Sequence, residues 1–206
     1  MFGFGIRDLA LPYGKTTPWW HGYRAGPNGP LPAMVFEPPS GRLYGASLLD
    51  ANTLDLSGLS LGAGVSLMIW GGFDYVLGSS GYATMLSLET ASTSANRARI
   101  YINQINGIPR LVNFDAGASQ AQLTPQNSPS PSGQIERIAA RIFPDDFACS
   151  INGMAPDTDG SGTVAVGFDR LHLLSHSTAA SYPGTVTKVA LWTESLSNAQ
   201  VQALTV

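Results

Sequence analysis

The sequence has few cysteines and few charges, and each shortage excludes a class of protein. A single cysteine, Cys149, among 206 residues excludes an intramolecular disulfide. Eleven basic and 14 acidic residues give a net charge of −3, with no lysine or arginine run that could follow a phosphate backbone, so nucleic-acid binding is not expected. No apolar stretch approaches the length of a membrane span. The first residues, interrupted by Arg7 and Asp8, do not form a signal peptide, so we expect synthesis in a cytoplasm and no membrane insertion.

Carboxylates are too scattered for the usual glycan-cleaving sites. The chain has four glutamates, and no predicted strand carries two carboxylates at positions i and i+2, the pairing that a glycosidase of a sandwich fold would need. Arg99 and Tyr101 share one predicted strand face, as in a polysaccharide lyase, but Gln134 and His172 are expected to lie elsewhere, apart from this face. The polar face of a half-buried sheet explains the pair equally well. We therefore predict that the chain is not an enzyme.

Metal and triad patterns are also missing. The three histidines are His21, His172 and His176. None has the orienting acid of a serine triad, and the last two fall in an extended segment where the i, i+4 spacing does not converge on a metal. Asp157 and Asp159 lie in a segment that resembles part of a calcium loop but lacks the closing glutamate. A glycine- and aspartate-rich hairpin turn is the simpler interpretation.

What the sequence does have is turn-punctuated strands. Apolar residues make up 44% of the chain, with 23 glycines and 14 prolines, and Asn96–Gln104 alternates Ala98, Ile100 and Ile102 with polar residues. Gly64–Tyr75 is almost continuously apolar, which predicts a central strand covered on both faces, and Gly71-Gly72 permits a bulge. Further strands are expected at Ala33–Glu37, Arg42–Gly45, within Ser47–Ser60, and at Gly81–Thr90, Ile108–Phe114, Ile135–Phe143, Asp146–Met154, Thr163–Phe168 and Leu171–Ser175, with at most one in Gly117–Gly133.

The first 31 residues differ from the rest. They mix glycine and proline with aromatic residues and show no sustained period of two or 3.6. Such a segment is too apolar for a free tail, so we predict an extended arm over residues 1–31 that docks on a partner, followed by one domain over 32–206. The predicted anchors are Phe2, Phe4, Trp19, Trp20 and Tyr23. Trp70 and Trp192 lie within apolar strands and are expected in the core.

The chain closes with Gly184–Thr205, in which a β-branched strand is followed by residues at helical spacing that Ser195 or Ser197 can cap. The pattern G-x-V-x-x-V-A-L-W-x-x-x-L-S-N-A-Q-x-Q-A-L-T resembles the C-terminal signature of concanavalin A-like (laminin G-like) jelly-roll domains, especially those of bacteriophage tail-fibre and virion surface proteins. The expected fold is all-β, a two-sheet antiparallel jelly-roll sandwich with an extended N-terminal arm and a short C-terminal helix.

The resemblance implies a bacteriophage virion structural protein, either a tail-fibre or baseplate-associated module or a capsid decoration or fibre module, attached by its arm. Other virion proteins and a homo-oligomer would then be its partners, and the virion its location. The alternative is a lectin-like module that binds host surface glycans, although the sequence does not place a sugar site. No cofactor is expected; a calcium ion on the rim, held by Asp157 and Asp159 as in laminin G-like domains, is the open alternative.

Overall fold

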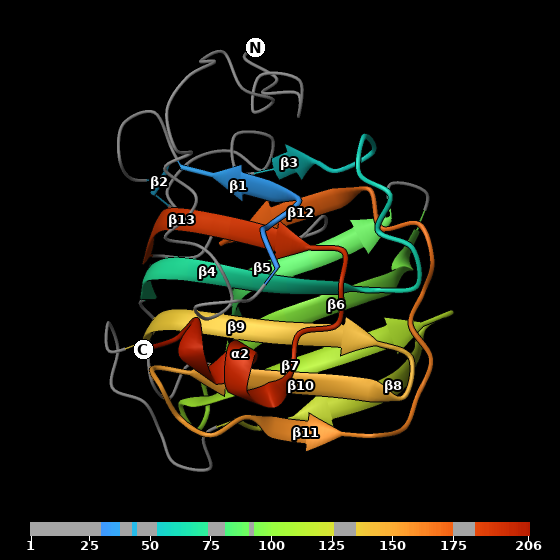
Figure 1. Cartoon of the computed structure of the whole chain (residues 1–206). Coiled ribbons are helices and arrows are strands. Elements are labelled where there is room, and N and C mark those ends of the chain that lie inside the picture. Colours follow the sequence, from blue (N-terminus) through green and yellow to red (C-terminus); the bar gives the residue numbers. More distant parts are fainter. Residues whose placement is uncertain are drawn as a thin grey trace, which may run out of the picture.

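Strands dominate the part of the chain that the computed structural model describes, which comprises residues 30–37, 43–44, 53–73, 81–90, 93–125, 135–174 and 184–206. They form two antiparallel sheets (Figure 1). The first contains β1 (Met34–Phe36), β2 (Leu43–Tyr44), β4 (Val65–Phe73), β9 (Ile135–Phe143), β10 (Asp146–Ile151), β11 (Asp157–Asp159) and β13 (Gly184–Trp192). The second contains β3 (Thr53–Asp55), β5 (Tyr82–Thr90), β6 (Thr93–Asn103), β7 (Ile108–Asp115), β8 (Ala118–Leu123) and β12 (Arg170–Leu173).

The strand order shows how distant parts of the chain meet. The seven-stranded sheet runs β1–β13–β4–β9–β10–β11, with β2 also paired to β13, and the six-stranded sheet runs β3–β12–β5–β6–β7–β8. Strands from the beginning and end of the chain therefore lie side by side in both sheets. The expected all-β, two-sheet jelly-roll sandwich is confirmed. Among the described residues, no helix is long and apolar enough to cross a membrane.

Most strands lie where the sequence predicts them, with two exceptions. The strand expected over Thr163–Phe168 does not form, and Gly162 and Gly167 flank and interrupt this stretch with φ values of 124° and 80° that extended pairing does not use. Asp157–Asp159, expected as a turn, instead forms β11 and pairs with β10. The prediction of a turn was therefore wrong at this position.

The end of the chain folds as its sequence pattern predicts. After β13 comes helix α2 (Asn198–Ala203), and its cap is Ser197. The Ser197 hydroxyl accepts a hydrogen bond from the Gln200 backbone N–H (3.3 Å), and the Gln200 side chain accepts one from the Ser197 N–H (2.8 Å), which together form a capping box. Ser195, the other expected cap, donates instead to the carboxylate of Asp146 at 2.7 Å.

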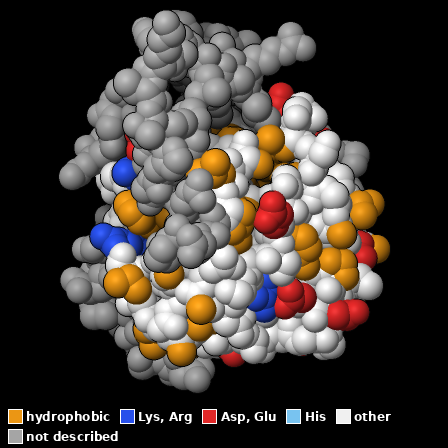
Figure 2. All heavy atoms as spheres, in the orientation of Figure 1, with side chains coloured by type: hydrophobic (Ala, Val, Ile, Leu, Met, Phe, Trp, Pro, Cys, Tyr) orange, Lys and Arg blue, Asp and Glu red, His pale blue; other side chains and the backbone are white. Residues whose placement is uncertain are grey.

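Helix α2 covers part of the outer face of the seven-stranded sheet, the face seen in Figure 2. The apolar residues under it are Met68, Ala139, Ala190, Trp192, Leu196, Val201 and Leu204. Met68 lies on β4, whose other face points into the sandwich, so the prediction of a central strand covered on both sides is confirmed. Trp192 is buried as expected, and its indole N–H donates to the carbonyl of Pro30 at 3.1 Å.

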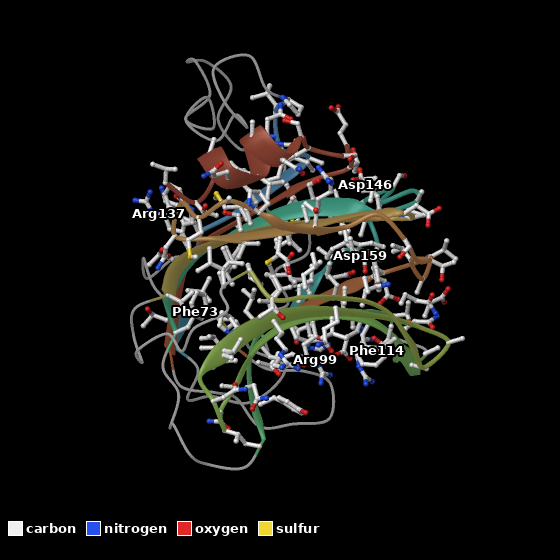
Figure 3. The ribbon with its side chains drawn as sticks, turned by 90° about the horizontal axis from the view of Figure 1, so that it is seen from below. Phe73, Arg99, Phe114, Arg137, Asp146 and Asp159 are labelled. Carbon is white, nitrogen blue, oxygen red and sulfur yellow. The ribbon has the colours of Figure 1, made fainter. Side chains whose placement is uncertain are left out.

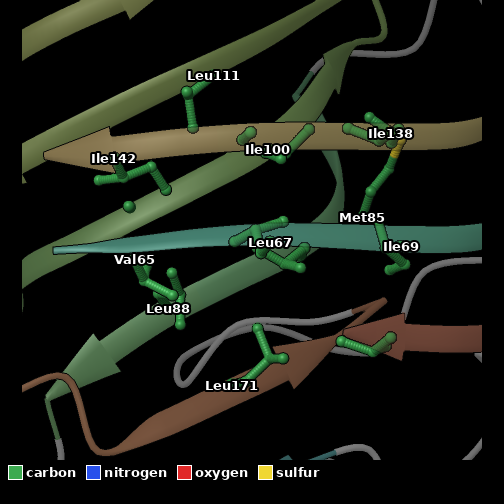
Figure 4. Close-up of a cluster of buried hydrophobic side chains, with 14 of the residues drawn as sticks. Val65, Leu67, Ile69, Met85, Leu88, Ile100, Leu111, Ile138, Ile142 and Leu171 are labelled. Atoms are coloured by element: carbon green, nitrogen blue, oxygen red, sulfur yellow. The ribbon is translucent and has the colours of Figure 1, made fainter. Parts of the chain in front are cut away.

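The main core lies between the two sheets (Figure 3). Leu67 of β4 and Ile138 of β9 face Leu88 of β5, Ile100 of β6 and Leu171 of β12, and all five side chains are fully buried (Figure 4). These residues alternate with outward-pointing ones along each strand, as the pleat requires. Cys149 belongs to this core as a small packing residue, and burial raises the pKa of its thiol far above the usual range.

Gly71 and Gly72 mark an irregularity in the seven-stranded sheet. The register of β4 against β9 shifts between Trp70 and Phe73, where the sequence predicts a bulge. At Gly71 an added Cβ would lie 1.9 Å from the backbone carbonyl oxygen of Thr185, whereas at Gly72 its nearest neighbour is the Thr185 hydroxyl at 3.4 Å. Only Gly71 is therefore required by close approach of two backbones.

We expect Gly71→Ala to lower the free energy of unfolding by about 3 kcal/mol, since β13 must move to admit the methyl group. Gly72→Ala is the matched control and should change this free energy by less than about 1 kcal/mol. Urea denaturation of the two variants and the parent protein measures the difference. Equal stabilities for the two variants would contradict the close contact.

Candidate functional site

The outer face of the six-stranded sheet carries an unusual set of side chains. Along β6, Ala98, Ile100 and Ile102 point into the core, so Arg97, Arg99 and Tyr101 point outward, as the alternation in the sequence predicts. In Figure 3 the sheet containing β5–β7 is arched, and Arg99 and Phe114 lie on its concave side, away from the seven-stranded sheet. The polar face of this sheet is thus its concave outer face.

The register lines up the charged residues of four strands. The first row contains Arg170 of β12, Glu89 of β5, Arg97 of β6 and Phe114 of β7. The second contains His172, Ser87, Arg99 and Val112, and the third contains Thr84, Tyr101 and Arg110. We call this surface the arginine face and define it by Arg97, Arg99, Arg110, Arg170, Glu89, His172 and Asp55, which lies opposite Arg170. These arginines are spread over 74 positions of the sequence, from 97 to 170. The sequence therefore contains no basic run that would have predicted the cluster.

Glu89 is the centre of this face. It is 1% exposed, and a buried carboxylate is costly without donors around it. Its Oε1 accepts a hydrogen bond from the Ser87 hydroxyl at 2.6 Å and lies 3.5 Å from a guanidinium nitrogen of Arg99. Its Oε2 lies 4.0 Å from Nε2 of His172. The Glu89 carboxylate therefore lies between the permanently charged guanidinium of Arg99 and the titratable imidazole of His172.

His172 was expected to lie apart from Arg99 and Tyr101, and this prediction was wrong. β12 pairs with β5, and β5 pairs with β6, so the imidazole lies in the same row as Arg99. Nδ1 is 2.9 Å from the Thr53 hydroxyl on the other side. Burial lowers the pKa of His172 below its usual value of 6.5; Glu89 opposes this shift, while Arg170 and Arg99 add to it. The neutral ring is thus the form that the fold favours.

Aromatic rings and a second carboxylate complete the face. The guanidinium of Arg97 lies 4.5 Å from the centre of the Phe114 ring, a cation–π contact. Tyr101 is buried and hydrogen-bonded to Arg110, and burial raises the pKa of its phenol, so the hydroxyl stays protonated. At the edge strand β3, the Ser57 hydroxyl and N–H hydrogen-bond Asp55 and lower the pKa of its carboxyl. Four arginines thus share the face with two carboxylates.

The opposite outer face differs. In Figure 2 its basic side chains lie at separate places between scattered hydrophobic ones. Trp70, expected in the core, is only half-buried there, with Arg137 at 4.6 Å and Lys188 at 5.1 Å from the centre of its ring. Its indole N–H donates to the carbonyl of Leu204 at 3.1 Å, which fixes the end of α2. Trp70 therefore serves the attachment of the helix.

Asp157 and Asp159, the two calcium candidates, accept hydrogen bonds from neighbouring strand and turn residues. Asp157 accepts hydrogen bonds from the N–H groups of Thr124 (2.6 Å) and Thr158 (3.0 Å). Asp159 accepts from the N–H and the hydroxyl of Ser161 at 3.0 and 2.8 Å. β11 thus carries two carboxylates at i and i+2, contrary to the prediction that no strand does. Within the described residues, no three histidine, cysteine, aspartate or glutamate side chains gather as metal ligands would.

The remaining predicted site residues lie outside the described residues. These are the arm anchors Phe2, Phe4, Trp19, Trp20 and Tyr23, together with Gln134, His21 and His176. Only residues 30–31 of the predicted arm are described, and the arm's role stays a prediction.

Comparison with known proteins identifies the fold. No protein-family model and no curated protein matches the sequence. Among solved structures, the CBM40 module of the Ruminococcus gnavus IT-sialidase matches with a TM-score of 0.57 and 14% identity over 85% of this chain and 100% of that module. The same module bound to α2,6 sialyllactose matches with a TM-score of 0.56 and 15% identity over the same shares. A native heptameric SAP-like pentraxin from Limulus polyphemus has a TM-score of 0.50 and 14% identity, over 70% of each chain.

The chain also matches a region of a larger enzyme. The Trypanosoma rangeli sialidase has a TM-score of 0.52 and 13% identity over 69% of this chain, but this region is only 22% of the sialidase. At such identities these matches establish the jelly-roll fold. The matched proteins include carbohydrate-binding modules that are the size of this chain's sandwich.

We expect the free energy of unfolding to decrease as the pH is lowered below about 6.5. The reason is that His172 binds a proton more readily in the unfolded chain than in the folded one, where its pKa is lowered. The contribution of His172 is present above this pH and is lost as the pH falls toward its lowered folded value. His172→Asn, which keeps a hydrogen-bonding side chain near Thr53, should remove at most about 1.4 kcal/mol per pH unit from the slope, the value for one proton.

The measurement is the free energy of unfolding of both proteins between pH 7.5 and about 4.5. His21 and His176 are present in both, so the difference between the two curves isolates His172. Parallel curves would show that the imidazole titrates as freely in the folded protein as in the unfolded one.

Proposed function

We propose that the arginine face is a glycan-binding site that recognises a carboxylate-bearing sugar. The observation that carries the proposal is the row in which Arg170 and Arg97 flank Glu89 in register, with Arg99 in the next row. Arginine is charged at any working pH, and its planar donors match both oxygens of a carboxylate. A ligand carboxylate placed between these side chains would receive charge-assisted hydrogen bonds.

The balance of charges supports an acidic sugar over a polyanion. The face holds four arginines and two carboxylates, in a chain whose net charge is −3. Glu89 lies 3.5 Å from Arg99, and Asp55 lies opposite Arg170, so acidic and basic side chains alternate on this face. Glu89 and Asp55 would repel a run of phosphates, whereas a sugar hydroxyl can donate to a carboxylate. Rows of arginine, carboxylate and aromatic side chains on a rigid sheet are typical of sites that orient a polar ligand.

The structural neighbours support the same class of function. Two of them are CBM40 structures with sialyllactose bound, one with the α2,3 and one with the α2,6 form. Sialyllactose carries one carboxylate on a short neutral glycan, so it is a suitable first probe for this chain. The lectin-like alternative derived from the sequence is thus the function that the geometry favours.

Binding is proposed without cleavage. A glycosidase needs an acid and a base or nucleophile on either side of the bond it breaks. Glu89 is 1% exposed and already hydrogen-bonded to Ser87, and Asp55 is held by Ser57 at the far edge of the sheet. With Arg170 between them in register, these carboxylates serve better as partners of the arginines than as a catalytic pair.

The virion role predicted from the sequence concerns where such a module is carried, and it is compatible with glycan binding. The C-terminal pattern on which that prediction depends folds as the strand β13 and the helix α2. Assembly as a homo-oligomer, as in the heptameric pentraxin, would multiply weak single-site binding.

The first test measures affinity for sialyllactose by calorimetry. Arg97→Gln and Arg170→Gln should each weaken binding by roughly tenfold or more, since each removes a charge-assisted hydrogen bond worth about 1.5–3 kcal/mol. Arg137→Gln removes the same charge from the opposite sheet and should leave the affinity unchanged. An affinity that is equal in all four proteins, or no binding by the parent protein, would contradict the proposal.

The second test concerns cleavage. Prolonged incubation with sialyllactose should release neither the acidic sugar nor lactose, as followed by chromatography of the mixture. A Glu89→Gln variant serves as the control, because any release that it abolishes would identify Glu89 as a catalytic acid or base and overturn the non-catalytic assignment.

A further inference from the structure

Tyr82 stands out among the large hydrophobic side chains that the described residues expose. These side chains are Leu31, Tyr82, Ile105, Met154, Val166 and Val206. Tyr82 is 51% exposed and is the one aromatic residue of this set. It lies at the start of β5, on the same side of the sheet as the arginine face, opposite Asn103 of β6. The arginine face thus has an exposed aromatic ring at one end, where a ligand could contact it.

The Tyr82 ring packs against a second aromatic ring, that of Tyr101. Its centre lies 4.6 Å from that of Tyr101, with an angle of 59° between the rings, which is a tilted aromatic pair. Tyr101 is only 9% exposed and is itself hydrogen-bonded to Arg110. Tyr82 is therefore supported by a buried ring before any ligand arrives, and such preorganisation lowers the entropy cost of binding.

The distance from the arginines shows what kind of ligand could use Tyr82. Tyr82 is level with Asn103, and Arg99 lies four residues back along β6. At about 3.3 Å per residue the two positions are roughly 13 Å apart. A single sugar ring cannot touch both, whereas a chain of two or three sugars running along β6 can.

The chemistry at the two ends differs. The arginine end offers cationic donors for a carboxylate, while the tyrosine end offers an aromatic face with one hydroxyl. The apolar C–H face of a neutral pyranose packs on such a ring, and its hydroxyls can bond to the phenol or to the surrounding polar groups.

We propose that Tyr82 forms a second subsite that binds a neutral sugar further along the same glycan as the acidic one, so that the face selects an acidic oligosaccharide over the free acidic monosaccharide. This inference rests on the proposed function, because it assumes that the arginine end binds the acidic sugar. The ligand lies along β6, with its acidic residue over Arg97 and Arg99 and a neutral residue on Tyr82.

The experiment compares three probes by calorimetry: free N-acetylneuraminic acid, α2,3 sialyllactose, and lactose. The parent protein should bind sialyllactose roughly five- to tenfold more tightly than N-acetylneuraminic acid, the gain expected from one stacked ring. Tyr82→Ala should remove this gain and leave the affinity for N-acetylneuraminic acid unchanged. Tyr82→Phe keeps the ring and should keep most of the gain.

The outcomes separate the two proposals. If the parent protein and Tyr82→Ala bind both acidic probes with one common affinity, the tyrosine subsite is wrong while acidic-sugar binding stands. If the parent protein binds neither acidic probe, the proposed function fails and the subsite fails with it. Unchanged affinity of Tyr82→Ala for N-acetylneuraminic acid also shows that this variant is folded, so a loss confined to sialyllactose supports the subsite.

Discussion

The contact of Glu89 with Arg99 determines the chemistry of the six-stranded sheet. A carboxylate withdrawn from water needs donors, and the Ser87 hydroxyl and the Arg99 guanidinium supply them. In register, Arg170 lies between Glu89 and Asp55, and Arg97 lies on the other side of Glu89. The proposed binding of an anion therefore depends on the arginines that are arranged around this one buried carboxylate.

The two outer faces of the sandwich differ in the side chains that they carry. On the seven-stranded sheet the chain covers its own apolar outer side chains, with α2 lying over Met68 and Trp192. On the six-stranded sheet the outward positions carry the arginines, together with carboxylate and aromatic side chains. Because side chains alternate along each strand, the arginine face shares its strands with the core but not its side chains. Substitutions of Arg97 or Arg170 thus change the outer face, while Ala98 and Leu171 keep the interior packed.

Local patterns in the sequence predict a large part of this arrangement. The alternation in Asn96–Gln104 places Arg97, Arg99 and Tyr101 on one face, and the closing motif predicts both β13 and α2. Both depend on short-range periodicity, which a single strand or helix reveals on its own.

What the sequence could not predict depends on which strands become neighbours. His172 reaches Glu89 only because β12 pairs with β5, across more than eighty intervening residues. The same pairing brings Arg170 into the row of Arg97. Hydrophobic periodicity carries no information on strand order, so the site itself stayed hidden although one of its strands was predicted correctly. Asp157–Asp159 was missed for a related reason, since a three-residue edge strand gets its pairing from β10 and not from its own composition.

The position of β13 has a consequence for how the protein is made. This strand lies between β1 and β4, so β1 has no connection to the β4–β9–β10–β11 part of the sheet until residues 184–192 have left the ribosome. Until then the apolar strand β4 presents an unpaired edge, and β1 lacks the partner that ties it to the sheet. Completion of this sheet therefore waits for residues 184–192, and a nascent chain stalled before β13 would expose a strand edge ready to pair with other chains. Pairing of β13 with β4 thus covers the strand edge through which the incomplete chain could aggregate.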